Sequence, residues 1–316
     1  MRVWKIISHD DITAVPDEMA IARLSYDCHF LASNSDKKNL QIASFNQDNF
    51  KYKVKAIGYY HSLPIFDIKW SPIPGYLATA SADCTIIIWR VEILKNVDGD
   101  DLINLHIVRR LCGHHKPINT INFSKNGTML VSAGQDATVI VWNVLNGKAM
   151  RKYRQYVKPV TSAVFDPHGQ FIVSTSTDGY YRITFLNGPK SNRMSYIVAR
   201  YRLMFVQISP NGRYLLFSDH AGRLVLVDYE NEKQVRQFVR AKEETVIPGE
   251  FAFAAPNYVV HGNGNSTGIT IAHCNTGDTV EKIQTDSPVL TIDINNLHKV
   301  GVAGLQDEQL VFFRIP

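Results

Sequence analysis

Residues 61–89 read HSLPIFDIKWSPIPGYLATASADCTIIIW, and residues 114–142 read HHKPINTINFSKNGTMLVSAGQDATVIVW. Aligned without gaps, the two stretches place a His, a Ser or Thr, an Asp and a Trp at the same spacing. These residues are His61, Thr79, Asp83 and Trp89 in the first stretch, and His114, Ser132, Asp136 and Trp142 in the second. The apolar runs between them are short and are bounded by Pro, Gly, Asn and Asp, which indicates β-strands joined by turns. The sequence therefore contains a repeat built from strands.

Weaker copies of this repeat lie on both sides of the two stretches. Their opening strands are IARLSY (21–26), VTSAVF (160–165), MFVQIS (204–209), EFAFAA (250–255) and VLTIDI (289–294). Asp178 and Asp307 keep the position of the repeated Asp in two of these copies. Seven units of about 45 residues account for the 316 residues. We therefore expect one domain spanning residues 1–316, although the length by itself suggests two domains of average size.

The Gly113-His114 pair, the Asp six residues before the Trp and the length of the repeat resemble the WD-repeat family. This resemblance covers the whole chain and implies an all-β fold: a seven-bladed β-propeller of four-stranded antiparallel blades. In weaker units Tyr156 and Thr184 stand in the places of His and Trp, and Gly222 stands in that of Asp. The second and third units are similar to the WD-repeat subunit of chromatin assembly factor. The last three units and the ending FFRIP are similar in layout to the WD-repeat subunit of histone methyltransferase complexes.

The two ends of the repeat array are expected to meet. The last unit ends after its third strand, LVFFRIP, while residues 1–8 contain a spare strand, RVWKIIS. If this first segment completes the last blade, the ring closes and no pairing edge stays exposed at a seam. Residues 92–102, EILKNVDGDDL, are expected to form an acidic insertion between two blades.

The repeated residues allow a catalytic and a structural interpretation. Ser, His and Asp are the members of a catalytic triad, but an active site occurs once, whereas this set recurs in consecutive units. A buried Asp needs hydrogen-bond partners to offset its desolvation, and the WD-repeat resemblance implies a network that ties the strands of a blade together. We therefore predict structural roles for the eight residues above and for Asp178 and Asp307, and no catalytic residues.

Other clusters give weak signals for a bound cofactor. Cys112, His114 and His115 lie close together, but no second Cys/His pair occurs at a zinc-like spacing. The glycine-rich stretch 261–268, HGNGNSTG, lies between two strands, with no following helix of the kind that a phosphate-binding loop needs. We therefore expect no metal site, no cofactor and no small-molecule substrate.

Half of the 34 Lys and Arg residues fall in five segments that contain no Asp or Glu. These segments are 51–55, 109–110, 151–158, 190–202 and 233–242, and they correspond to the outer strands of blades or lead into them. Positive charge on exposed strands discourages edge-to-edge aggregation. Alternatively, the segments form a basic rim that binds an acidic partner or nucleic acid. The residues proposed for the rim are Arg151, Lys152, Arg154, Arg193, Arg200 and Arg202.

A second candidate surface is the face of the ring around the mouth of its central channel, where these folds often bind peptides. Aromatic and cationic side chains are favoured as binding anchors, although ordinary solvated loops have a similar composition. The candidates on this channel face are Tyr60, Leu63, His115, Lys116, Gln135, Tyr156, Lys158, Tyr201, Asp286 and Gln306.

Composition narrows the function classes. The four cysteines are widely spaced, the net charge is +5, and the sequence lacks both a long apolar run and a secretory signal. We expect a protein of the nucleus and/or cytoplasm that is neither secreted nor inserted in a membrane. We predict a non-catalytic scaffold that binds other protein subunits or peptides, most simply in a nuclear chromatin- or RNA-related complex. The alternative is a cytoplasmic adaptor in translation, trafficking or ubiquitin ligation.

Overall fold

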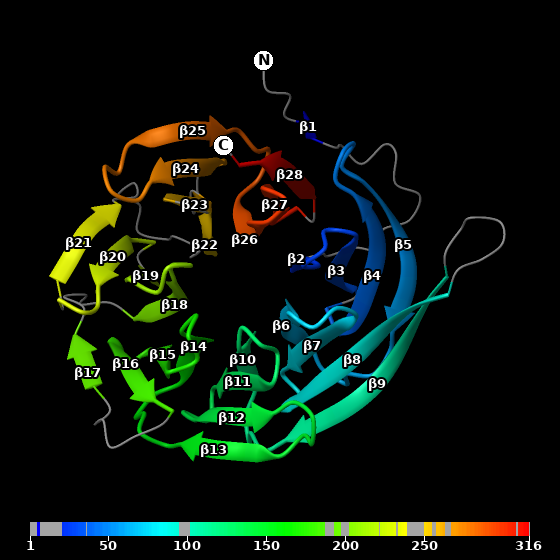
Figure 1. Ribbon diagram of the computed structural model, residues 1–316, viewed down its shortest axis with the longest axis horizontal. Helices are drawn as coiled ribbons and strands as arrows, with labels where there is room; N and C mark the ends of the chain where they lie inside the picture. The colour runs from blue at the N-terminus through cyan, green and yellow to red at the C-terminus, as the bar shows by residue number, and fades with distance from the viewer. Residues whose placement is uncertain are drawn as a thin grey trace.

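The computed structural model describes residues 5–6, 21–35, 37–94, 102–186, 193–196, 202–220, 222–231, 233–238, 250–254, 257–262, 267–307 and 309–315. These residues form strands β1 to β28, which pair into seven antiparallel sheets of four strands each. The sheets are arranged as blades around a central channel (Figure 1), so the predicted seven-bladed β-propeller is confirmed. Across the described ranges, no helix is long and apolar enough to span a membrane.

Each blade runs from an inner strand beside the channel to an outer strand at the rim (Figure 1). Blade 1 consists of β2 (Ala22–Leu24), β3 (Phe30–Ser35), β4 (Asn39–Asn46) and β5 (Lys51–Gly58). Blade 2 consists of β6 (Ile65–Trp70), β7 (Tyr76–Ser81), β8 (Thr85–Leu94) and β9 (Leu102–Cys112). Blade 3 consists of β10 (Ile118–Phe123), β11 (Met129–Gly134), β12 (Val139–Asn143) and β13 (Ala149–Tyr153).

The second half of the ring repeats this order. Blade 4 consists of β14 (Val160–Phe165), β15 (Phe171–Ser176), β16 (Tyr180–Phe185) and β17 (Arg193–Tyr196). Blade 5 consists of β18 (Leu203–Ile208), β19 (Tyr214–Asp219), β20 (Leu224–Asp228) and β21 (Lys233–Phe238). Blade 6 consists of β22 (Phe251–Ala254), β23 (Tyr258–Gly262), β24 (Ile269–His273) and β25 (Thr279–Ile283). Blade 7 consists of β26 (Val289–Asn295), β27 (Val300–Leu305), β28 (Leu310–Arg314) and β1 (Lys5–Ile6).

The ring closes as predicted, because β1 pairs with β28 as the outer strand of blade 7. Lys5 lies opposite Phe312 and Ile6 opposite Val311. The rest of segment 1–8 lies outside the described residues. The last blade of the ring therefore contains a strand from the N-terminal end of the chain.

The prediction that residues 92–102 separate two blades is wrong. β8 and β9 pair along their whole length, from Thr85 opposite Cys112 to Leu94 opposite Leu102, so the insertion lies within blade 2. This long hairpin extends past the ring toward blade 1 (Figure 1). Its apolar residues Val91 and Ile103 are buried in one cluster with Leu40 and Ile42 of blade 1. The physical reason is that an apolar hairpin surface can be buried by overlapping the neighbouring blade.

The core lies between blades. Seven hydrophobic clusters are buried, and each joins two neighbouring blades. Strands in the middle of a blade are therefore covered on both faces, and all six residues of β15 are buried. This explains the nearly continuous apolar runs of the middle strands, since strict alternation is expected only where one face meets water.

Two local features recur along the inner edge of the blades. Gly127, Gly169 and Gly212 have φ values of +69°, +68° and +73° in the turn after an inner strand, a conformation that favours glycine. The inner strands β6, β10, β14, β18 and β26 each contain a register shift near their start. Such a β-bulge turns one side chain away from the ladder. The bulged residues, called here the bulge ring, are Phe66, Asn119, Thr161, Met204 and Leu290.

Candidate interaction surfaces

The structure brings the repeated His, Ser or Thr, Asp and Trp together inside blades 2 and 3. In blade 2, Trp89 Nε1 donates to Thr79 Oγ1 (2.9 Å), which lies 2.7 Å from His61 Nε2, and His61 Nδ1 lies 2.9 Å from Asp83 Oδ2. Because the ionised carboxylate can only accept, the ring donates to it from Nδ1, and Nε2 of the neutral ring accepts from the Thr79 hydroxyl. The same chain of hydrogen bonds links Trp142, Ser132, His114 and Asp136 in blade 3.

Burial and hydrogen bonding act on these groups in opposite directions. Burial alone would raise the pKa of Asp136, but bonds from His114, Thr138 and the backbone N–H of His115 outweigh it and hold that pKa well below its usual range. The pKa of Asp83 is lowered in the same way by Thr85 and His61, against the effect of burial. Desolvation by burial lowers the pKa of His61 despite the bond to Asp83. In blade 2 the arrangement therefore suits a neutral His61 held by an ionised Asp83.

Blade 4 uses other residues in these places. Tyr156, expected on the channel face as a binding residue, is 8% exposed, and its hydroxyl bonds to Ser174. Arg182 pairs with Asp178 (3.0 Å) and lies 4.4 Å from the centre of the Tyr156 ring. The structure therefore differs from the prediction for Tyr156. In blade 4 this ring fills the position that His occupies in blades 2 and 3, and it is buried there.

Asp307 in blade 7 also differs from the prediction. Its side chain is exposed, and its Oδ1 lies 3.5 Å from the backbone nitrogen of Gln309. The His position is taken by Thr285, whose hydroxyl donates to the backbone oxygen of Ser287. Without an imidazole to bind, the Asp stays at the surface.

The basic rim is partly used within the ring. Arg109 Nη2 donates to the backbone oxygen of Leu145 in the next blade (3.0 Å), and Arg236 Nη2 donates in the same way to Asn275 (2.7 Å). Lys152 Nζ donates to the backbone oxygen of Gly113 (2.6 Å). These cations bridge neighbouring blades, which is a structural use of rim charge that the sequence interpretation did not include.

The remaining rim candidates fall into three groups. Arg151 and Arg154 are exposed beside the outer strand of blade 3. Arg202 is exposed but lies directly before β18, at the channel face, where its backbone oxygen accepts from His220 (2.9 Å). Arg200 lies outside the described residues, as does the side chain of Arg193. The rim prediction therefore applies to fewer residues than the sequence suggested.

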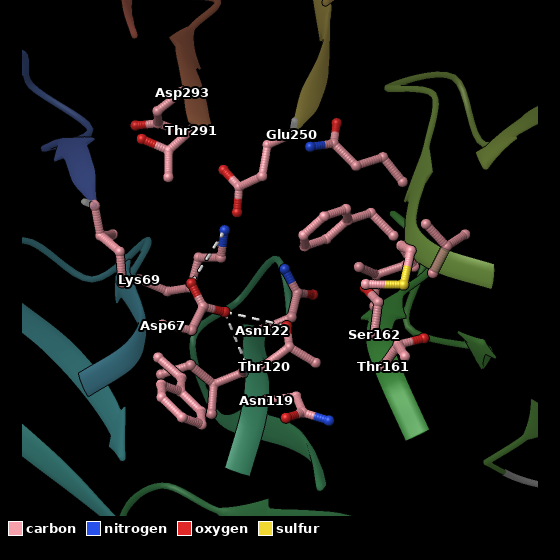
Figure 2. Close-up of a pocket in the computed structure, with 18 of the residues that line it drawn as sticks. Asp67, Lys69, Asn119, Thr120, Asn122, Thr161, Ser162, Glu250, Thr291 and Asp293 are labelled. Carbon is pink, nitrogen blue, oxygen red and sulfur yellow. Dashed lines mark hydrogen bonds and ion pairs between the residues drawn. The ribbon is translucent and has the colours of Figure 1, made fainter. Parts of the chain in front are cut away.

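The bulge ring marks the mouth of the channel. All five of its residues line one cavity of about 710 Å³. Asn119 Nδ2 donates to the backbone oxygen of Val160 (2.7 Å), and Thr161 Oγ1 donates to that of Leu203 (2.9 Å), so these two polar members bind the next blade. The other three members, Phe66, Met204 and Leu290, are apolar. Asn119 and Thr161 are seen in Figure 2.

Polar side chains deeper in the channel tie each inner strand to the next blade. Inner strands are sheet edges, and their free N–H groups need acceptors. The acceptors and the N–H groups they bind are Asp67 with Ile121 (3.0 Å), Asn122 with Phe165 (3.0 Å), Gln207 with Phe253 (3.2 Å), Glu250 with Ile292 (3.3 Å) and Asp293 with Leu24 (2.8 Å). Asp67, Glu250 and Asp293 point into the cavity in Figure 2. The sequence analysis missed them, although each polar residue in a mostly apolar strand, such as Asp67 in IFDIKW, was a usable signal.

Arg23 joins three blades across the channel wall. It is 2% exposed, and its Nη2 lies 2.7 Å from Glu250 and 3.5 Å from Asp67. Burial alone would lower the pKa of Arg23, but the carboxylates of Glu250, Asp67 and Asp293 raise it. Burial would likewise raise the pKa of Glu250, and Arg23 and Lys69 lower it. Both groups are therefore held in their charged forms.

The exposed candidates of the channel face surround the mouth on several blades. Tyr60 and Leu63 are 47% and 49% exposed in the loop before β6. The other exposed candidates are His115, Lys116, Gln135, Lys158, Asp286 and Gln306. Tyr201 lies outside the described residues. Among the residues that the structure describes, no group of three or more His, Cys, Asp and Glu could hold a metal ion, and Cys112 is exposed beside a His114 that is bonded within its blade.

Comparison with known proteins agrees with this geometry. The family described as WD domain, G-beta repeat matches residues 54–90, 105–143 and 147–183. Similar proteins are Protein HIR1 of Candida albicans, 33% identical over 128 residues, and the Chromatin assembly factor 1 subunit FAS2 homolog of Oryza sativa subsp. japonica, 28% identical over 177 residues. A third is a subunit of chromatin assembly factor 1 from Mus musculus, 26% identical over 133 residues.

These matches cover 39%, 53% and 39% of this chain, but only 14%, 34% and 23% of the three relatives, respectively. They confirm the resemblance to chromatin assembly factor subunits. Each matched repeat begins in the outer strand of one blade, or just before it, and ends in the third strand of the next, so every repeat links two blades. This chain therefore folds as a seven-bladed β-propeller in which residues 54–90, 105–143 and 147–183 match the WD40 repeat.

Proposed function

We propose that this chain is a non-catalytic interaction subunit of a nuclear chromatin-assembly complex. The observation that carries the proposal is the similarity of its best-formed repeats to HIR1 and to chromatin assembly factor 1 subunits. The relatives are longer than the matched parts, so the proposal concerns the propeller as an interaction module and not every activity of those proteins.

The use of the chemically versatile side chains supports a scaffold over an enzyme. His61 and His114 bind Asp83 and Asp136 within their own blades, and the hydroxyls nearest the two histidine Nε2 atoms accept from Trp N–H groups. The channel carboxylates accept backbone N–H groups of the next blade. These groups stabilise a rigid ring, which presents loops on two faces and a rim to several partners at once.

Affinity purification of the tagged chain from nuclear and cytoplasmic extracts, followed by quantitative mass spectrometry, tests this function. We expect enrichment of histones and of chromatin-assembly subunits over a tag-only control, at moderate and at high salt. A partner set restricted to translation, trafficking or ubiquitin-ligase proteins would instead support the cytoplasmic adaptor. Fractionation of the same cells gives an independent readout, since the proposal expects a nuclear pool.

A further inference from the structure

The mouth of the channel offers an apolar anchor point. Phe66 is 41% exposed although it lies in an inner strand, and it lines the same cavity as Met204 and Leu290. All three residues stand at β-bulges, as do Asn119 and Thr161, whose side chains instead bind the next blade. An exposed aromatic ring beside a cavity is the kind of pocket in which a binding partner buries a large side chain.

Four exposed cations lie on the same face around this mouth, and we call them the basic arc: Lys38, Lys116, Lys158 and Arg202. Lys116 and Lys158 each directly precede a proline just before an inner strand, and Arg202 directly precedes β18. Lys38 lies in the β3–β4 turn. That turn reaches blade 2, because the backbone oxygen of Lys37 accepts from the N–H of Ile65 (2.6 Å). The basic arc thus extends over blades 1, 3, 4 and 5.

The carboxylates in the described loops of this face are paired in blades 1 to 5 and exposed in blade 7. In the described loops of blades 1 to 5, Asp83 and Asp136 bind His61 and His114, while Asp178 and Asp219 pair with Arg182 and Arg223. The exposed carboxylates Asp286 and Asp307 belong to blade 7, on the other side of the mouth. The carboxylates Asp67, Glu250 and Asp293, which line the same cavity, accept backbone N–H groups of the next blade. The face therefore combines three apolar side chains at the mouth with the exposed cations of the basic arc.

We infer that the channel face binds an acidic segment of a partner protein, with one bulky apolar side chain of that segment inserted at the Phe66, Met204 and Leu290 mouth. This inference rests on the proposed function as an interaction subunit and specifies the chemistry of the partner. Charge complementarity selects Asp and Glu for the basic arc and raises the association rate. Nucleic acid would match the charge but would leave the apolar mouth without a counterpart, so a peptide fits both features.

Selection from a displayed library of random peptides of about 12 residues, with the whole chain as bait, provides the probe. We expect the enriched peptides to contain several Asp or Glu residues around one Leu, Ile, Met, Phe or Trp. The strongest peptide is then synthesised with a fluorophore, and its Kd is measured by anisotropy at low and high salt. We expect the Kd to rise severalfold with salt, because the attraction is partly between exposed charges.

Variants locate the site. The double variant Lys116→Glu/Lys158→Glu should weaken binding by about tenfold or more. Its matched control is Lys125→Glu/Lys148→Glu, which makes the same change of charge. Both control residues are exposed in turns of blade 3 on the opposite face, and the control should change the Kd by less than about twofold. Phe66→Ala should weaken binding by about tenfold and Phe66→Leu much less, with melting temperatures measured to show that both variants are folded.

The inference is overturned by no enrichment, by enrichment of neutral or basic peptides, or by equal losses in the two charge-reversal variants. It is also overturned if a duplex DNA of about 20 base pairs binds more tightly than the selected peptide and loses affinity in the same variants. Failure of the proposed function is distinguishable: purification from extracts would then yield no chromatin proteins, whatever the peptide results. Conversely, chromatin partners retained unchanged by Lys116→Glu/Lys158→Glu would leave the function standing and refute this site.

Discussion

Replacing Asp136 with Ala should lower the free energy of unfolding by about 2 kcal/mol. The carboxylate receives hydrogen bonds from His114 Nδ1 (3.0 Å), the backbone N–H of His115 (3.0 Å) and the hydroxyl of Thr138 (2.7 Å). The His114 side chain is fully buried, so its ring N–H loses its acceptor without gaining water. A buried donor left without a partner costs about 1–3 kcal/mol. Thr138 Oγ1, 3.2 Å from Nδ1, can accept this proton in part, which argues against the upper end of that range.

Asp307→Ala is the matched control, because Asp307 holds the same repeat position in blade 7 but is exposed and has no histidine beside it. Its change should stay within about 0.5 kcal/mol. In thermal unfolding followed by circular dichroism, Asp136→Ala should lower the melting temperature by about 3 °C and Asp307→Ala by about 1 °C or less. Equal shifts in the two variants, or an unchanged melting temperature in Asp136→Ala, would refute the assignment of this network as a stabilising element.

Three further predictions concern pH, the channel and the last blade. Because the pKa of His61 is lowered on folding, the unfolded chain takes up a proton at His61 before the folded chain does as pH falls below about 6.5, so the free energy of unfolding should fall as pH falls. In urea titrations His61→Gln should show a weaker dependence of this free energy on pH than the native chain. An identical dependence in the two chains would contradict the prediction. Arg23→Leu should lower the free energy of unfolding by about 3 kcal/mol, since the buried Asp67 and the partly buried Glu250 carboxylates keep, among the described residues, only Lys69 as a nearby cation. Arg23→Leu/Glu250→Gln should regain part of this loss in the same urea assay, and a double variant no more stable than the single one would argue against the ion pair. Gly301→Ala should lower stability by about 1–3 kcal/mol because its Cβ would contact the buried ring of Phe313, and an unchanged melting curve would contradict the stated contact.

The repeat and its strands were predictable because their causes are local. Turn residues at fixed offsets and short apolar runs identify strands, and the spacing of His114, Ser132, Asp136 and Trp142 fixes which strands carry the network. The closing role of the N-terminal strand also followed from counting, since blade 7 lacks one strand without it.

The candidate site was predicted less completely. The spacing places Tyr156 at the histidine position of blade 4, yet we also expected it as a binding residue of the channel face, and it is buried with its hydroxyl bonded to Ser174. Rim cations such as Arg109 and Arg236 look available for a partner, yet they bind backbone oxygens of the next blade. Both errors have one cause: a contact between residues of different strands or blades depends on register and side-chain reach, which a linear pattern does not contain.

The sequence by itself determined the number of blades and their order, because these follow from the count of repeats along the chain, and the network inside blades 2 and 3, because it depends on spacings within a single repeat. Only the tertiary structure decided what lies between repeats. It placed the 92–102 insertion in a hairpin of blade 2 that packs on blade 1, joined Arg23 to Glu250 across the channel, and moved Arg202 from the rim to the channel face. The physical reason is that closing a ring brings together residues that are far apart in the chain, so their contacts are set by the geometry of the whole ring and not by any one repeat.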